Sequence, residues 1–152
     1  MEKASAKPIL RKAALLALCY LSFAIFALML TRQPNAVASI WLANAVACAF
    51  LIESPRRQWP GLLLATAISN CAAELLFGDH LYVALYFSLT NIIEISFAAW
   101  LVQRSGLAEH FTDSPKALGR VMLSACSVPM LASASLGALG LSMMGVDDYR
   151  DL

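Results

Sequence analysis

The chain has 152 residues, of which 60% are apolar and only 14% are charged, and its mean hydropathy is +0.69. Soluble domains average about 45–50% apolar and about 25% charged residues, so this composition excludes an ordinary water-soluble globule and favours a protein embedded in lipid. The net charge of +1 argues against nucleic acid as a partner, because phosphate binding needs a strongly basic face.

Five apolar stretches follow one another along the chain. A helix of about 20 residues crosses the hydrocarbon core of a bilayer, so each stretch is interpreted as a transmembrane span. A basic lead, residues 1–12, precedes them, and a polar tail, residues 145–152, follows them. The spans are predicted at about 13–30, 36–52, 61–77, 81–102 and 118–144. The sequence therefore predicts an all-α, polytopic transmembrane helix bundle.

The fifth span differs from the others in its small residues. Ser133 and Gly137, and likewise Ala134 and Ala138, are spaced four residues apart, a pattern that allows two membrane helices to approach closely. Pro129 is expected to kink this span, because proline interrupts the helical hydrogen-bond ladder. Packing is the role that this pattern favours.

Basic residues alternate between the loops and predict an orientation. The lead carries four of them, the loop after the second span has Arg56 and Arg57, and the loop after the fourth span has Arg104 and Lys116. The intervening loops have few. Lysine and arginine accumulate on the cytoplasmic side, so these residues are predicted to determine the topology, with the N-terminus inside and Leu152 outside.

Three asparagines lie near the middle of successive spans. Asn44, Asn70 and Asn91 fall at about the same depth, because the second and fourth spans run in the direction opposite to the third. An amide that faces lipid without a partner costs several kcal/mol. Hydrogen bonds between the amides across packed helices are therefore expected.

Other polar residues share helix faces with these amides. Helical spacing places Trp41 beside Asn44, places Thr66 and Glu74 with Asn70, and places Ser88 and Glu94 with Asn91. One interpretation is a polar cavity between spans two, three and four that binds a small ligand or relays a proton. The other is that these side chains only hold the helices together. The candidate intramembrane site comprises Trp41, Asn44, Thr66, Asn70, Glu74, Ser88, Asn91 and Glu94.

No arrangement typical of catalysis or metal binding is expected. The four cysteines lie within apolar segments without a CxxC pair, and His80 and His110 lie in different loops. The sequence contains no nucleophile motif with the spacing of known hydrolases. The chain is therefore predicted to have no catalytic residues, no metal site and no cofactor.

Short motifs between residues 30 and 104 resemble the first class of the bacterial membrane-associated sensor (MASE) domain family. They occur in the expected order as LTRQP at 30–34, IWLANA at 40–45, ESPRRQWP at 53–60, LLLA at 62–65, LLFGD at 75–79 and N-x-x-E at 91–94. Two positions depart from the family pattern: Leu42 stands where proline is common, and Ala45 where glycine is common.

The resemblance implies an integral sensory module of the bacterial inner membrane. Such modules usually precede histidine kinase, diguanylate cyclase or phosphodiesterase domains, and typically have about eight spans. With five spans and no output domain, the chain is expected to be the N-terminal part of a longer module or a stand-alone product. Expected partners are membrane lipid, a cytoplasmic signalling output domain or protein, and, as a further option, a second copy of the chain. The alternative function is a small transporter or channel component that uses the Asn and Glu face as a polar path.

Overall fold

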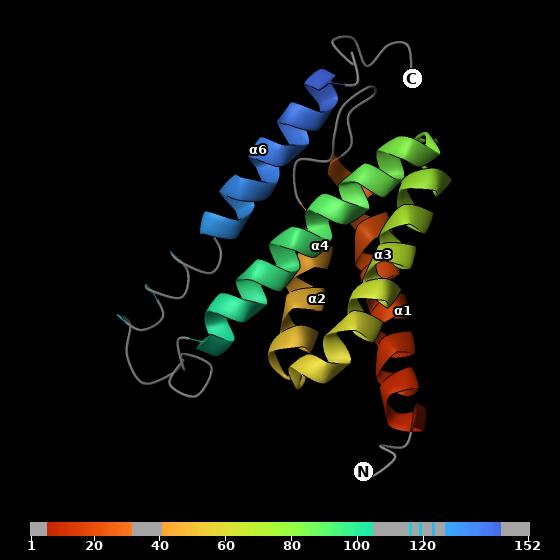
Figure 1. The fold of residues 1–152 in the computed structure, drawn as a ribbon. Helices are drawn as coiled ribbons and strands as arrows, with labels where there is room; N and C mark the ends of the chain where they lie inside the picture. The colour runs from red at the N-terminus through yellow and green to blue at the C-terminus, as the bar shows by residue number, and fades with distance from the viewer. Residues whose placement is uncertain are drawn as a thin grey trace.

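The computed structural model describes residues 6–31, 41–104, 116, 119, 123 and 127–143, and every regular element in that part is a helix. The chain runs back and forth along one axis through α1, α2, α3 and α4, and α6 lies against the outside of α4 (Figure 1). This arrangement confirms the predicted all-α bundle. The elements are α1 (Ala6–Thr31), α2 (Ala43–Ile52), the 3₁₀ turn η1 (Arg56–Gln58), α3 (Trp59–Leu76), α4 (Leu81–Arg104) and α6 (Val128–Met143).

Three helical stretches are long and apolar enough to cross a membrane: Pro8–Leu30, Arg56–Leu76 and Leu81–Arg104. The stretches Ala43–Ile52 and Val128–Gly140 are apolar but shorter. The spans predicted at 36–52 and 118–144 continue into residues outside the described part, as do the polar tail and most of the loop before Lys116. The lengths of these two spans therefore stay predictions.

Three helices extend beyond the apolar spans predicted from the sequence. Helix α1 begins at Ala6 instead of residue 13, α3 begins at Trp59 instead of residue 61, and α4 ends at Arg104 instead of residue 102. A helix satisfies its own backbone groups, so it continues past the lipid boundary where long basic side chains reach water. A tight turn joins α3 to α4, and in it Gly78 adopts a φ of 92°, a left-handed conformation that glycine tolerates best.

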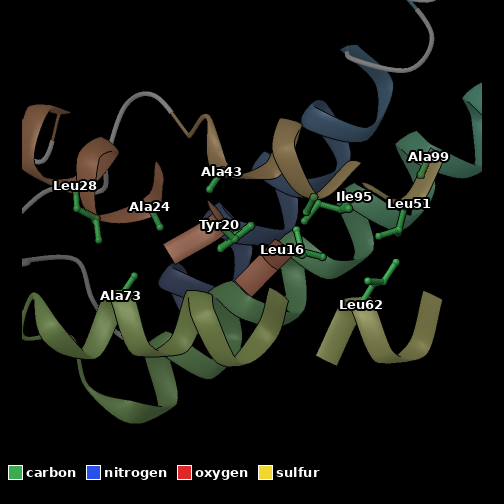
Figure 2. Packing of buried hydrophobic residues seen from close by; sticks show 11 residues of the cluster. Leu16, Tyr20, Ala24, Leu28, Ala43, Leu51, Leu62, Ala73, Ile95 and Ala99 are labelled. Carbon is green, nitrogen blue, oxygen red and sulfur yellow. The ribbon is translucent and has the colours of Figure 1, made fainter. Parts of the chain in front are cut away.

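The core lies between α1, α2, α3 and α4, and it is built from one face of each helix. On α1, buried residues recur at every fourth position, as Leu16, Tyr20, Ala24 and Leu28. Figure 2 shows Tyr20 in the middle of this cluster, facing the other helices. Alanines dominate the facing surfaces and let the backbones approach closely, which is how helices pack where lipid provides no hydrophobic driving force. The cluster is completed by Ala43, Ala47, Leu51, Leu62, Ala73, Ile95 and Ala99.

Helix α6 packs on α4 through a face of small residues. Ser133, Gly137 and Gly140 are buried there. The ring of Tyr86 lies directly against Gly140, and its hydroxyl donates a hydrogen bond to the carbonyl oxygen of Leu136. A Cβ atom at Gly140 would overlap the Tyr86 ring, so this contact requires glycine.

The two small-residue pairs of the fifth span have different surroundings. The Ser133–Gly137 pair makes the contact with α4, whereas Ala134 and Ala138 are exposed in the described part of the structure. Pro129 is the second residue of α6, in the first turn, where its missing N–H leaves no helical bond unmade. Because residues 124–126 lie outside the described part, the predicted kink at Pro129 is not tested.

Candidate functional site

Four polar side chains meet in the centre of the bundle, one from each of the first four α-helices. The Tyr20 hydroxyl of α1 donates to Asn44 Oδ1 of α2 at 2.9 Å and lies 3.0 Å from Asn70 Oδ1 of α3. Asn44 Nδ2 donates to Asn91 Oδ1 of α4 at 3.1 Å, and Asn91 Nδ2 donates to Asn70 Oδ1 at 3.0 Å. These bonds form a closed ring, hereafter the polar ring.

The hydrogen bonds of the polar ring continue into two side branches. Trp41, just before α2, donates its indole N–H to the Tyr20 hydroxyl at 3.1 Å. Asn70 Nδ2 donates to Ser88 Oγ at 2.9 Å, and Ser88 in turn points its hydroxyl at the carbonyl oxygen of Ala67, 3.5 Å away. Donors and acceptors therefore alternate in one direction, from the indole through the ring to a backbone carbonyl.

The Tyr20 hydroxyl is the one member of the polar ring with a choice of acceptor. It has a single hydrogen, and the carbonyl oxygens of Asn44 and Asn70 lie at nearly equal distances from it. The hydrogen is therefore shared, or moves between α2 and α3. Asn70 Oδ1 has two lone pairs, so it accepts from Asn91 in either case.

The polar ring satisfies its own hydrogen-bonding groups. Within the described residues, no buried side-chain nitrogen or oxygen lacks a partner. Asn70 is completely buried and Asn44 nearly so. The amides thus bond to one another across the helices, as expected from their common depth, and they act as links between helices without any ligand. Whether the same residues also bind a ligand stays a prediction.

The remaining predicted site residues, Thr66, Glu74 and Glu94, make none of the hydrogen bonds described above. Thr66 is fully buried, but its hydroxyl bonds to the Leu62 carbonyl of its own helix at 3.0 Å. Glu74 is buried and Glu94 is half-buried. The predicted set therefore divides into five members of the network and three neighbours.

Sequence reasoning missed Tyr20, which joins α1 to the ring. The first span contains no amide or carboxylate, so nothing marked one of its faces as polar. A signal was nevertheless present. Tyrosines of membrane helices are enriched at the two interfaces, where the hydroxyl reaches water, and Tyr20 lies well inside α1. A mid-span tyrosine needs a buried partner for its hydroxyl.

A second polar cluster fastens α2 to α4 at the end of the bundle where η1 lies. Gln103 Nε2 lies 3.2, 3.0 and 3.1 Å from the carbonyl oxygens of Leu51, Ile52 and Ser54. The last carbonyls of any helix have no intrahelical donor, so Gln103 provides the missing partner for α2 from another helix. The indole N–H of Trp59 also donates to Leu51 and Ser54, at 3.1 and 3.2 Å.

Replacing Gln103 with methionine is expected to lower the unfolding free energy by about 1 kcal/mol, because the Ile52 carbonyl loses its side-chain donor. Replacing Gln103 with glutamate should cost more, since a carboxylate cannot donate and repels the same oxygens. Unfolding by a denaturing detergent, followed by circular dichroism, measures both changes. The neighbouring variant Arg104→Gln, at an exposed position, is the control. Equal stabilities for all three variants would contradict this role of Gln103.

The residues of the site favour hydrogen-bond exchange over covalent chemistry. In the described ranges, no three metal-ligating side chains come together. What the polar ring offers is a set of neutral donors and acceptors on four helices, with two carboxylates beside it. A movement of any one of these helices alters the hydrogen bonds that hold the other three, because the bonds form one connected network.

Comparison with protein families gives one result. A family model, MASE1, matches residues 13–150, which include all the described helices except the first residues of α1. Comparisons with curated proteins and with solved structures give no match. The match covers nearly the whole chain, and the apolar helices fit a protein that passes the membrane several times. The chain belongs to the MASE1 family of membrane-associated sensor domains.

Proposed function

We propose that this chain is the sensory input module of a signalling system, and that the polar ring transmits the signal between its helices. The observation that supports this function is the closed ring of Tyr20, Asn44, Asn70 and Asn91, which links four helices through side chains alone. A change in helix positions would then alter the activity of a fused or associated output domain, which would be a histidine kinase, a diguanylate cyclase or a phosphodiesterase. The chain itself performs no catalysis in this scheme.

The proposed transmission uses the two acceptors of the Tyr20 hydroxyl. In one state its hydrogen bonds to Asn44 and holds α1 against α2, and in the other it bonds to Asn70 and holds α1 against α3. The two acceptors lie 2.9 and 3.0 Å from the hydroxyl oxygen, so the hydrogen can bond to either one without a movement of the helices. A stimulus that favours one state by a few kcal/mol shifts the population and moves the helix ends.

Replacing Tyr20 with phenylalanine should fix the signalling output at one level, because the exchangeable hydrogen is removed while the ring that fills the core remains. The test compares cells that lack the gene, express the wild type, or express Tyr20→Phe, and measures cyclic di-GMP and histidine phosphorylation over changing growth conditions. The control Tyr82→Phe removes a hydroxyl at an exposed position of α4 and should respond like the wild type. A Tyr20→Phe variant with a full wild-type response would overturn the proposed exchange.

The alternative function is a transporter or channel component in which Glu94 and Glu74 line a polar path. The burial of Glu74 and the partial burial of Glu94 within the helix bundle support it. Proteoliposomes containing the purified chain would then conduct protons or small cations, and Glu94→Gln would reduce that flux at least about tenfold, as expected for a required intramembrane carboxylate. Flux in the wild type with no signalling change in the Tyr20 variant would favour this second function.

We further propose that the module resides in the bacterial inner membrane with its N-terminus in the cytoplasm. The turn between α2 and α3, the end of α4 and the start of α1 lie at the same end of the helices (Figure 1). The turn contains the exposed Arg56 and Arg57, and α4 ends at the exposed Arg104, which supports the loop alternation found in the sequence. Reporter fusions after Gly78 and after Arg104 test this orientation. Alkaline phosphatase should be active after Gly78 and inactive after Arg104, and the reverse pattern would contradict the orientation.

A further inference from the structure

The end of the bundle that carries η1 gathers basic side chains from three elements. Arg11 and Lys12 belong to the first turns of α1, Arg56 and Arg57 form η1, and Arg104 ends α4. Four of the five are exposed, and Lys12 is partly buried. These five residues are hereafter the basic end. Glu53, just before η1, is the acidic residue at this end among the residues that the structure describes, so the described side chains here are mainly cationic.

Contacts between the elements place the basic residues around one surface. Arg56 Nε donates to Gln103 Oε1 at 3.4 Å, which sets η1 beside the last turn of α4. The start of α1 reaches the same region, because the nearest side-chain atom of Ile9 would lie 3.8 Å from a Cβ at Gly61, in the first turn of α3. The basic residues of α1, η1 and α4 therefore form one continuous surface.

Aromatic rings lie under the cations of the basic end. The Arg56 guanidinium lies 5.8 Å from the ring centre of Trp59, and that of Arg104 lies 5.1 Å from the ring centre of Trp100. The Lys12 ammonium lies 5.9 Å from the Phe50 ring centre. The Trp59 ring is held in place by its indole hydrogen bonds to the carbonyl oxygens of Leu51, in α2, and Ser54, just after it. Tryptophans of membrane proteins lie at the headgroup level, so these cations are at the depth of lipid phosphates.

We infer that the basic end binds anionic phospholipid headgroups. Arginine presents a planar set of donors that matches phosphate oxygens. Among the described residues, the hydrogen bond of Arg56 to Gln103 is made by Nε, so its two terminal nitrogens can donate to a phosphate. The rings of Trp59 and Trp100 supply the apolar contact for the glycerol and upper acyl chain. A bound lipid would bridge η1 and the end of α4, the elements that Gln103 already joins. This binding is independent of the proposed signalling exchange at Tyr20.

The test titrates the detergent-solubilised full chain with phosphatidylglycerol or with phosphatidylcholine of the same acyl chains, and follows tryptophan fluorescence. The wild type should bind phosphatidylglycerol at least about tenfold more tightly, since each basic residue near an anionic surface contributes about fivefold in affinity. Added salt should reduce the difference. The triple variant Arg56→Gln/Arg57→Gln/Arg104→Gln, which keeps only Arg11 and Lys12 of the basic end, should lose most of the preference for phosphatidylglycerol.

Two further variants sharpen the result. Glu53→Gln removes the opposing charge and should strengthen phosphatidylglycerol binding, and Arg56→Lys/Arg57→Lys/Arg104→Lys tests whether charge alone is sufficient. These positions are exposed, and circular dichroism checks that each variant stays helical. Equal binding of both lipids by the wild type would overturn the inference. Full selectivity in the triple glutamine variant would also overturn it and would favour an acidic protein partner for the basic end. Complete competition by soluble glycerol phosphate would overturn it as well, because it would indicate a site for free anions.

Discussion

Replacing Asn70 with leucine is expected to destabilise the bundle by about 2–4 kcal/mol, because three hydrogen bonds are lost in a position fully shielded from water. Asn70 accepts from Tyr20 and Asn91 and donates to Ser88, a side branch of the polar ring, so it has one more side-chain partner than either other asparagine. Leucine fills a similar volume, which restricts the change to hydrogen bonding. Equilibrium unfolding in mixed micelles, followed by circular dichroism, measures the difference.

Thr66→Val is the matched control for Asn70→Leu. Thr66 lies one turn away on the same face of α3 and is equally buried, but its hydroxyl bonds only to the Leu62 carbonyl of its own helix. Its removal should cost less than about 1 kcal/mol, since no link between helices is broken. If the two variants were equally stable, the links made by the polar ring would contribute nothing beyond packing.

Replacing Gly140 with alanine should separate α6 from α4, at a cost of about 1–3 kcal/mol for the overpacked contact. The new methyl group would overlap the ring of Tyr86, and this ring cannot turn away without breaking the bond from its hydroxyl to the Leu136 carbonyl. Faster hydrogen exchange of the α6 backbone, measured by mass spectrometry alongside unfolding, would report the separation.

Two variants test the origin of the Gly140 effect. At Gly137, one turn earlier on the same face, an added Cβ would meet the nearest atom of Phe87 at 3.8 Å, an ordinary contact, so Gly137→Ala should be tolerated. In Gly140→Ala/Tyr86→Ala the clash is removed, and the double variant should lose less stability than the sum of the two single changes. Strict additivity would show that Gly140 acts through its own helix and not through Tyr86.

The composition and the periodicity of the sequence were sufficient to predict the helices and some of the residues of the candidate site. Apolar runs about as long as a bilayer is thick predict spans directly, because lipid admits few other backbone structures. The alternating direction of these spans brought Asn44, Asn70 and Asn91 to a common depth. Their hydrogen bonds followed, since an unpaired amide is costly in lipid.

Helix ends and helix neighbours could not be predicted in the same way. The sequence placed Gln103 in a loop, because polarity marks the limit of the apolar span and not the limit of the helix. In the structure Gln103 belongs to the last turn of α4 and donates to the carbonyl oxygens of Leu51 and Ile52 in α2, which lie 52 and 51 residues earlier in the sequence. One sequence contains no signal for which helix end lies beside which.

The sequence by itself determined that this protein is a helical membrane bundle with amides at mid-depth, because burial in lipid imposes those features on each helix separately. Only the tertiary structure decided that the Tyr20 hydroxyl completes the polar ring and that the Tyr86 ring packs against Gly140. Both contacts depend on how two helices are rotated toward each other. Side-chain packing sets that rotation, and α1, apolar on nearly every side, offers no periodic pattern that would predict it.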